Sequence, residues 1–187
     1  METLPTRCHW VNQDPEYIAY HDNEWGKPTK DNHQLFEMIC LEGQQAGLSW
    51  YTILKKRQGY RELFHQFDPE KIALMNETDV ERLMQDARII RNRLKINAII
   101  SNAKAYLSMK NHGEDFSTFI WAFVNHQPKV NNWTESSQVP AETELSKTLS
   151  KALKKQGFKF VGSVTCYAFM QATGMVNDHL VSCCQYK

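Results

Sequence analysis

The sequence predicts an all-α fold in a single domain. Helix-capping signals recur along the chain, apolar residues repeat at helical spacing, and runs of strict apolar/polar alternation are hard to find. The chain has 187 residues, of which 42% are hydrophobic and 23% are charged, as is typical of a soluble globular protein with a buried core. We expect residues 1–187 to form one domain of two helical lobes.

Capping residues predict where the helices of the first half begin. Asp31 followed by Gln34 resembles an N-cap with its partner. The apolar face that follows contains Leu35, Phe36, Ile39 and Cys40. Asp68 precedes a proline, which is favoured in the first turn of a helix. Thr78 with Glu81 forms a capping-box pattern, and the apolar stripe behind it contains Val80, Leu83, Met84 and Ala87.

Glycines predict where the helices of the second half end. One apolar stripe contains Ile96, Ile99, Ala103 and Leu107 and stops at Gly113, and the next contains Phe116, Phe119, Ile120 and Phe123. Residues 125–141 are the only long loop that the pattern indicates. A helix containing Leu145, Leu149, Ala152 and Leu153 then stops at Gly157, and a final apolar helix of about 163–173 stops at Gly174.

Charge gives no global sign of a nucleic-acid-binding protein, because the formal net charge is +1. Basic residues nevertheless gather in two windows. The first contains Arg88, Arg91, Arg93 and Lys95, and the second contains Lys147, Lys151, Lys154, Lys155 and Lys159. Each window fits either a solvated helix face or a local phosphate-binding surface.

Cysteine usage indicates a reducing compartment. The five cysteines are odd in number and scattered, which argues against a disulfide framework. The first thirty residues lack an apolar signal segment, and no stretch is long enough to cross a bilayer. We therefore expect a cytoplasmic protein without a membrane partner.

Two cysteines and two histidines near the chain ends make a candidate metal site: Cys8, His21, His179 and Cys183. Two thiols and two imidazoles suit tetrahedral Zn²⁺, and four protein ligands leave no open position for substrate, so such an ion would be a structural clamp between residues 8–21 and 179–183. Spacing alone favours the plainer interpretation of two packed thiols and two surface histidines. Spacing also does not choose between Cys183 and Cys184.

A short turn of residues 157–162 joins the last two apolar helices and has a glycine at each end. Glycines allow a close backbone approach to a ligand, and the N–H groups that open the second helix carry the positive end of its dipole. Such a turn fits a phosphate site and an ordinary helix connection equally well. Lys154, Lys155 and Lys159 favour the phosphate site.

Aromatic residues gather near the N-terminus around one glutamate. They include Trp10, Tyr17, Tyr20, Trp25 and Trp50, and the glutamate is Glu42, next to a glycine in an apolar segment. Taken singly, such aromatics are most often core and such a glutamate is most often on the surface. Together they suit a flat cationic ligand, which would stack on the rings and donate N–H bonds to the carboxylate. An alkylated purine is such a ligand.

Four segments, residues 17–26, 41–50, 158–162 and 176–179, closely resemble the 3-methyladenine DNA glycosylase I family of the helix-hairpin-helix superfamily. The resemblance spans essentially the whole chain. It implies a helix-hairpin-helix glycosylase fold, with that motif at about 145–173, that grips DNA at Gly157, Lys159 and Gly162. It also implies one structural Zn²⁺ on Cys8, His21, His179 and Cys183 that joins the termini.

The resemblance further implies roles in the base pocket. Trp50 would stack on the excised base, Glu42 and Tyr20 would hydrogen-bond it as the catalytic pair, and Trp25 and Tyr17 would wall the pocket. The implied activity is the release of 3-methyladenine, with 3-methylguanine as a further candidate, from alkylated double-stranded DNA in base excision repair. We also expect a monomer, because one enzyme that acts on one lesion requires no symmetry.

One position departs from the wider superfamily, in which an aspartate assists the sugar cation; here Asn177 stands at that place. Methylation at N3 makes adenine cationic and a good leaving group, so the enzyme needs little acid catalysis and can act by base flipping and charge stabilisation. Glu42 is then the essential residue, in recognition rather than as a general base. No lysine is placed for Schiff-base chemistry, which predicts a monofunctional enzyme.

Three other functions fit parts of the pattern. A non-catalytic reader of alkylated DNA would use the same pocket and hairpin. A zinc-dependent hydrolase would leave one of the four candidate ligands off the metal, so that the metal activates water. A plain helical interaction module would leave the glycine-flanked turn and the polar residues around Glu42 without a purpose.

Overall fold

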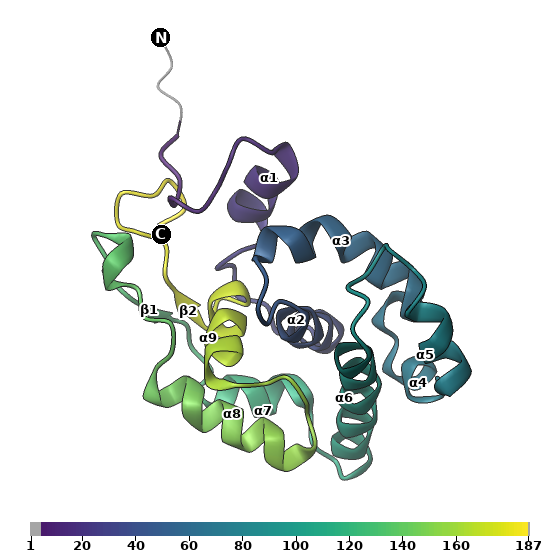
Figure 1. Ribbon diagram of the computed structural model, residues 1–187. Coiled ribbons are helices and arrows are strands. Elements are labelled where there is room, and N and C mark those ends of the chain that lie inside the picture. The colour runs from purple at the N-terminus through teal and green to yellow at the C-terminus, as the bar shows by residue number, and fades with distance from the viewer. Residues whose placement is uncertain (1–4, 187) are drawn as a thin grey trace.

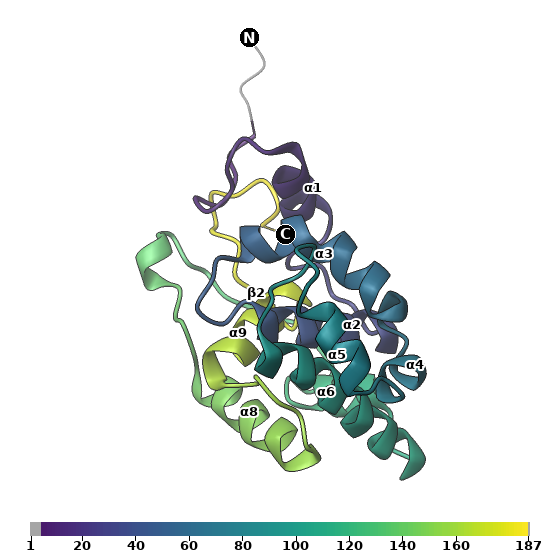
Figure 2. The same ribbon diagram turned by 45° about the vertical axis from the view of Figure 1, so that its right-hand side comes forward.

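The computed structural model describes residues 5–186 and is mostly helical (Figures 1 and 2). In chain order the α-helices are α1 Pro15–Asn23, α2 Asn32–Gln44, α3 Trp50–Leu63, α4 Pro69–Ala73, α5 Glu77–Leu83, α6 Arg93–Asn111, α7 Phe116–Ala122, α8 Glu144–Gln156 and α9 Ser163–Ala172. Short 3₁₀ turns occupy His65–Phe67 and Ser136–Gln138. None of the helices in this part of the chain has the length and apolarity to cross a membrane.

The predicted all-α class is correct except for one small sheet. Strand β1, Lys129–Val130, pairs in parallel with β2, Val176–Asn177, with Lys129 opposite Val176. Strand β1 and the second 3₁₀ turn lie within the segment predicted as a long loop. The pairing ties that segment to the chain that follows α9, beside the C-terminal residues.

The predicted helix starts are confirmed at two caps and wrong at one. The Asp31 side chain accepts from the Gln34 N–H at 2.9 Å, and Asp68 accepts from the Glu70 N–H at 3.0 Å. The capping box at Thr78 and Glu81 is wrong. Helix α5 begins two residues earlier, where the Asn76 side chain caps the helix and the Asp79 carboxylate accepts from the Asn76 N–H at 2.9 Å.

Helix α2 lies in the middle of the molecule and packs against α3, α6, α7 and α9 (Figure 1). Its apolar face is fully buried, and Leu35, Phe36 and Ile39 have no exposed surface. Helices α4, α5 and α6 lie on one side of α2, and α8 and α9 lie on the other. The division of the domain into two lobes stays a prediction. Residues 1–4 and 187 of the predicted domain lie outside the residues that the structure describes.

The two chain ends meet beside α1. The segment that precedes α1 runs next to the loop that follows β2 in both views (Figures 1 and 2), and the Cys184 N–H donates to the Thr6 carbonyl at 2.8 Å. Residues separated by almost the whole sequence therefore share one region of the fold.

Three of the four basic residues of the first window are engaged within the protein. Arg88 pairs with Glu62 and Asp86, and Arg93 pairs with two glutamates of α5. Lys95 is buried, and its ammonium donates to the carbonyls of Gln44 and Ala46 at 2.8 and 2.7 Å. This lysine closes the C-terminal end of α2, where helix carbonyls lack partners of their own.

Candidate active site

A cavity of about 290 Å³ opens between α1, the end of α2, the start of α3 and α9. Its lining is aromatic and polar: Cys8, His9, Trp10, Tyr17, Tyr20, Trp25, Glu42, Gln45, Trp50, Ser136, Val139, Ala168, Gln171, Asp178 and Leu180. The five predicted base-pocket residues are all among them. The volume and the mixed lining suit a small planar ligand.

Local structure explains why these side chains converge. Tyr17 and Tyr20 are three residues apart on α1, so they share one face of that helix. Glu42 lies in the last turn of α2, and Trp50 is the first residue of α3, immediately after its N-cap Ser49. The short α2–α3 connection therefore brings Glu42 and Trp50 to the same cavity.

Ring contacts fix the walls of this cavity. The Tyr20 and Trp50 rings lie 5.4 Å apart with an interplanar angle of 37°, and Trp10 packs against Trp25 at 5.0 Å and against Tyr17 at 5.1 Å. Aromatic pairs at these distances stabilise one another beyond their buried area. The walls of the cavity therefore consist of aromatic rings packed against one another.

Three buried polar atoms in the cavity have no hydrogen-bond partner among the described residues: the Tyr20 hydroxyl, Glu42 Oε2 and Trp50 Nε1. Leaving such an atom unpaired costs about 1–3 kcal/mol each, and buried polar groups in proteins are normally satisfied. All three atoms belong to residues that line one cavity. They are the donors and acceptor that a bound polar ligand would satisfy.

Burial changes the protonation of Glu42. Its side chain is 3% exposed, and desolvation raises the pKa of its carboxyl to about 8. Desolvation and the neighbouring Glu42 also raise the pKa of Tyr20 well above its usual value. Glu42 is thus mostly a neutral acid near pH 7, and a cationic ligand beside it would favour the carboxylate.

Several lining residues have no assigned role in the predicted base pocket. Trp10 belongs to the predicted aromatic cluster, and the structure places it in the cavity wall. Gln45, Ser136, Val139 and Gln171 carry no sequence pattern that marks a pocket. Their positions follow from tertiary packing, because Ser136 and Val139 come from the segment that β1 holds against β2.

Asp178, rather than Asn177, faces the cavity. One of its oxygens accepts from Asn131 at 2.7 Å and Trp133 at 2.8 Å, and the other accepts from Gln171 at 3.0 Å and from the Tyr167 hydroxyl. Four donors therefore hold this carboxylate in place at the edge of the cavity. The Asn177 side chain instead accepts from the His179 N–H at 3.1 Å.

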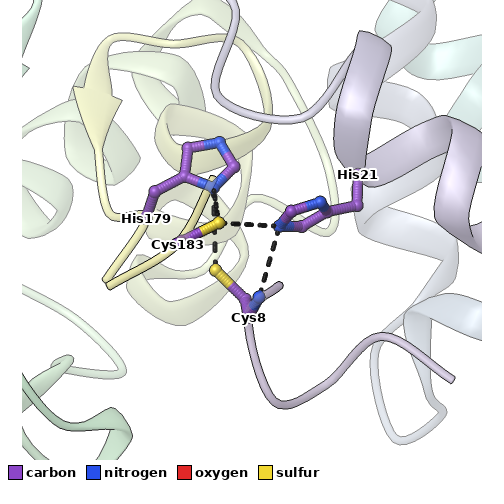
Figure 3. A group of neighbouring side chains, drawn as sticks. All are labelled: Cys8, His21, His179 and Cys183. Carbon is purple, nitrogen blue, oxygen red and sulfur yellow. Dashed lines mark hydrogen bonds between the residues drawn. The ribbon is translucent and has the colours of Figure 1, made fainter. Parts of the chain in front are cut away.

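The four predicted metal ligands meet at the junction of the chain ends (Figure 3). Their donor atoms all lie within 4.8 Å of one another, and all four residues are buried. Cys183 Sγ lies 3.4 Å from His21 Nε2 and 3.4 Å from His179 Nδ1, and Cys8 Sγ lies 3.6 Å from His179 Nδ1. The metal–ligand lengths of a tetrahedral Zn²⁺ would separate sulfur and nitrogen ligands by about 3.5 Å. The cluster is therefore able to hold a metal ion.

Outer contacts orient both imidazoles toward the centre of the cluster. His21 Nδ1 is 2.7 Å from the Asp22 carboxylate, and His179 Nε2 is 3.1 Å from the Trp25 carbonyl. Each ring therefore donates its N–H outward and points its other nitrogen inward, as metal-bound histidines do. Burial lowers the pKa of His179 to about 4, which keeps it a neutral ligand. Cys184 lies outside the cluster, so the choice of Cys183 agrees with the geometry.

The turn between α8 and α9 spans residues 157–162, as predicted. Only the first of its two glycines has a left-handed backbone conformation. Gly157 ends α8 in the left-handed conformation with φ of 100°, whereas Gly162 has φ of −62° and precedes α9 in extended backbone. The second left-handed residue is Phe160, with φ of 54°. Lys154, Lys155 and Lys159 are exposed around the turn, whereas Lys147 of the same window pairs with Glu142 and Glu144.

Comparison with known proteins finds that the chain is similar to glycosylases that act on methyladenine. Residues 10–186 match the family model described as methyladenine glycosylase. DNA-3-methyladenine glycosylase 1 of Escherichia coli (strain K12) is 67% identical over 180 residues, which are 96% of this chain and 96% of that protein.

Solved structures agree with this match. A crystal structure of 3-methyladenine DNA glycosylase I has a TM-score of 0.96 at 60% identity, over 97% of this chain and 100% of that one. A variant of 3-methyladenine DNA glycosylase I in complex with 3-methyladenine has a TM-score of 0.92 at 41% identity, over 97% of each chain. The chain, with its aromatic cavity around Glu42, belongs to the methyladenine glycosylase family.

Proposed function

We propose that this protein releases 3-methyladenine from alkylated double-stranded DNA by hydrolysing the N-glycosidic bond, in base excision repair. The homologues are DNA-3-methyladenine glycosylases, and a structural neighbour binds 3-methyladenine. The observation that carries the proposal is the set of unpartnered polar atoms on Tyr20, Glu42 and Trp50, inside one aromatic cavity. 3-Methylguanine is a further candidate product.

The proposed base contacts follow from the cavity. Trp50 stacks on the base, Tyr20 and Glu42 hydrogen-bond it, and Trp25 and Tyr17 complete the walls. A base made cationic by N3 methylation favours ionised Glu42, whose carboxylate then accepts an N–H and offsets the positive charge. A neutral adenine has no positive charge to offset the negative charge of the buried Glu42 carboxylate. Glu42 therefore favours the damaged base.

Catalysis in this proposal consists of binding and charge stabilisation. The nucleotide leaves the duplex, the cationic base is already a good leaving group, and the cavity stabilises the developing products. None of the described residues that line the cavity is a lysine, which supports a monofunctional glycosylase without lyase activity. Borohydride trapping of a covalent protein–DNA adduct would contradict that assignment.

The Cys8, His21, His179 and Cys183 cluster is proposed to hold one structural Zn²⁺. Two thiolates and two neutral imidazoles match the ligand preference of that ion, and four converging donors leave no open position on a tetrahedral metal. In this role the ion cross-links the chain ends, which carry two walls of the base cavity, Trp25 and Asp178.

The α8–α9 turn is proposed to grip one DNA strand as the hairpin of a helix-hairpin-helix motif. Gly157 and Gly162 allow close approach of a phosphate, and the N–H groups that open α9 present the positive end of its dipole. Lys159 adds a charge beside them. We propose that a monomer acts on each lesion, because one cavity and one hairpin suffice for one flipped base.

The test is to incubate the purified protein with methylated duplex DNA and identify the released bases by chromatography. We expect free 3-methyladenine and little or no 7-methylguanine. Glu42→Gln should lower the excision rate by about 100-fold, as for loss of one group that stabilises developing charge, whereas the exposed Glu114→Gln should not change it. A folded protein that binds methylated DNA and releases no base would instead be a damage reader.

A further inference from the structure

The turn between α8 and α9 has a strained backbone that its own helices do not fully explain. Phe160 is a non-glycine residue with φ of 54°, a conformation that costs roughly 1 kcal/mol or more for a bulky side chain. Such strain persists only where surrounding contacts hold it. The contacts of this turn therefore show which residues determine its shape.

Two of these contacts come from the helices that the turn joins. The Val161 carbonyl accepts from the Ser150 hydroxyl of α8 at 2.6 Å and from the Cys166 thiol of α9 at 3.4 Å. These bonds stabilise the α8–α9 pair as a unit. They do not fix where that unit lies relative to the base cavity.

The third contact comes from α6. Asn102 is 2% exposed, its Oδ1 accepts from the Lys159 N–H at 2.8 Å, and its Nδ2 donates to the Lys159 carbonyl at 3.4 Å. One side-chain amide thus pairs with both polar groups of a single turn residue. Asparagine lowers the stability of a helix interior relative to alanine, so this buried asparagine is explained by its bonds to the turn.

Helix α2 contacts the same turn at Gly43. A Cβ atom at Gly43 would lie 3.1 Å from the Phe160 carbonyl oxygen and 3.2 Å from Phe160 Cβ, so a glycine lets the two backbones approach closely. Gly43 follows Glu42 directly. The turn is therefore placed against α6 through Asn102 and against the cavity-bearing end of α2 through Gly43.

We propose that Asn102 is a positioning residue for DNA binding. By holding the Lys159 peptide, it sets the turn so that the Lys159 ammonium and the N–H groups that open α9 meet the DNA backbone while the flipped base reaches Glu42. The proposal rests on the proposed function, in which this turn contacts DNA. Asn102 itself touches neither DNA nor base, because its amide is buried behind the turn.

The experiment separates DNA binding from base binding. Asn102→Leu keeps the size of the side chain and removes both bonds to Lys159, together with a longer contact of 3.8 Å from Nδ2 to Cys40 Sγ. For this variant we expect about tenfold weaker binding of an undamaged fluorescent duplex by anisotropy. Affinity for free 3-methyladenine, followed by tryptophan fluorescence, should change less than twofold. Asn102→Ala should give the same pattern and replaces the leucine variant where that variant does not fold.

Two controls make the result decisive. Ile72→Ala truncates a fully buried side chain of α4 and destabilises the fold without touching the turn, so at a temperature where it remains folded both affinities should be unchanged. Lys159→Gln tests the turn itself, and it should weaken duplex binding and reduce the dependence of log affinity on log salt by about 1.

The other outcomes of these binding experiments contradict different parts of the proposal. Weakening of duplex binding by Lys159→Gln but not by Asn102→Leu would refute the positioning role and leave the proposed function intact. Equal losses of duplex and base affinity in Asn102→Leu would show that Asn102 supports the whole fold. No effect of Lys159→Gln on duplex binding or its salt dependence would refute the DNA contact at this turn, and the role of Asn102 with it.

Discussion

His179 contacts Trp25 in two ways. Its Nε2 donates to the Trp25 carbonyl at 3.1 Å, and the two rings pack edge to face with centroids 4.7 Å apart. His179 belongs to the Cys/His cluster, and Trp25 lines the base cavity. The cluster therefore supports a wall of the cavity directly, and loss of the proposed Zn²⁺ should affect both stability and base binding.

Cys183→Ser, or chelation of the metal, should lower the melting temperature and weaken binding of free 3-methyladenine. The expected loss is several kcal/mol of unfolding free energy, because binding of a structural metal contributes to folding. Thermal unfolding followed by circular dichroism, with metal content measured on the same samples, checks this. The matched control is Cys184→Ser, which changes the neighbouring thiol outside the cluster and should leave melting and metal content unchanged.

A different result would favour the zinc-dependent hydrolase. If chelation leaves the melting temperature unchanged and abolishes activity that added metal restores, the ion is catalytic and the four-ligand structural site is wrong. The convergence of all four donors within 4.8 Å is the reason that we expect the structural outcome.

Local sequence signals predicted the parts of the fold that depend on neighbouring residues. The caps at Asp31 and Asp68 were correct because a side chain two or three residues from an N–H closes the cap within one turn. Asp14 before Pro15 is the same signal as Asp68 before Pro69 and marks α1, which the sequence analysis did not assign. The error at Thr78 arose because Asn76 offers a cap two residues earlier.

Contacts across the sequence explain the rest. Lys95 belongs to a basic window, and only tertiary packing buries its ammonium against the end of α2. The spacing of the four residues Cys8, His21, His179 and Cys183 favours the interpretation that they do not form one site. Cys8 and His21 are thirteen positions apart, and no local motif joins them. The family resemblance, rather than spacing, identified that cluster. Asp178 and Trp10 line the cavity because the two ends of the chain pack together beside it.

Glu42→Gln should make the protein more stable relative to wild type as the pH rises. In the folded protein desolvation raises the pKa of Glu42 to about 8 from 4.5, so between these values the folded state keeps a proton that the unfolded state has lost. Wild-type stability therefore falls by up to about 5 kcal/mol across this range. Glutamine does not ionise and avoids this cost.

Urea unfolding at several pH values between about 3.5 and 9 measures the difference. The gap between Glu42→Gln and wild type should be constant below pH 4.5, widen up to about pH 8 and level off above it. Subtracting wild type removes the effect of groups that both proteins share, including the metal ligands. The exposed Glu114→Gln serves as the control and should show no such widening. A constant gap at every pH would mean that water or a neighbouring charge keeps Glu42 ionised in the empty cavity.

Tyr20→Phe and Tyr60→Phe should have opposite consequences although each removes one buried hydroxyl. The Tyr20 hydroxyl has no partner among the described residues, so its loss should leave stability unchanged or raise it by about 1 kcal/mol. The Tyr60 hydroxyl donates to Gln44 at 3.0 Å and accepts from the Ile90 N–H at 3.2 Å. Its loss should cost about 1–3 kcal/mol, because both partners remain buried or half-buried without it.

Base binding should reverse this order. Tyr20→Phe removes a group that we place on the base, so affinity for free 3-methyladenine should fall by about tenfold, while Tyr60→Phe, tested at a temperature where it stays folded, should bind normally. Chemical unfolding and fluorescence titration of the same two variants give both quantities. A Tyr20→Phe protein that loses stability and still binds the base would show that this hydroxyl serves the fold. The unpaired Tyr20 hydroxyl would then destabilise the free protein without contributing to base recognition.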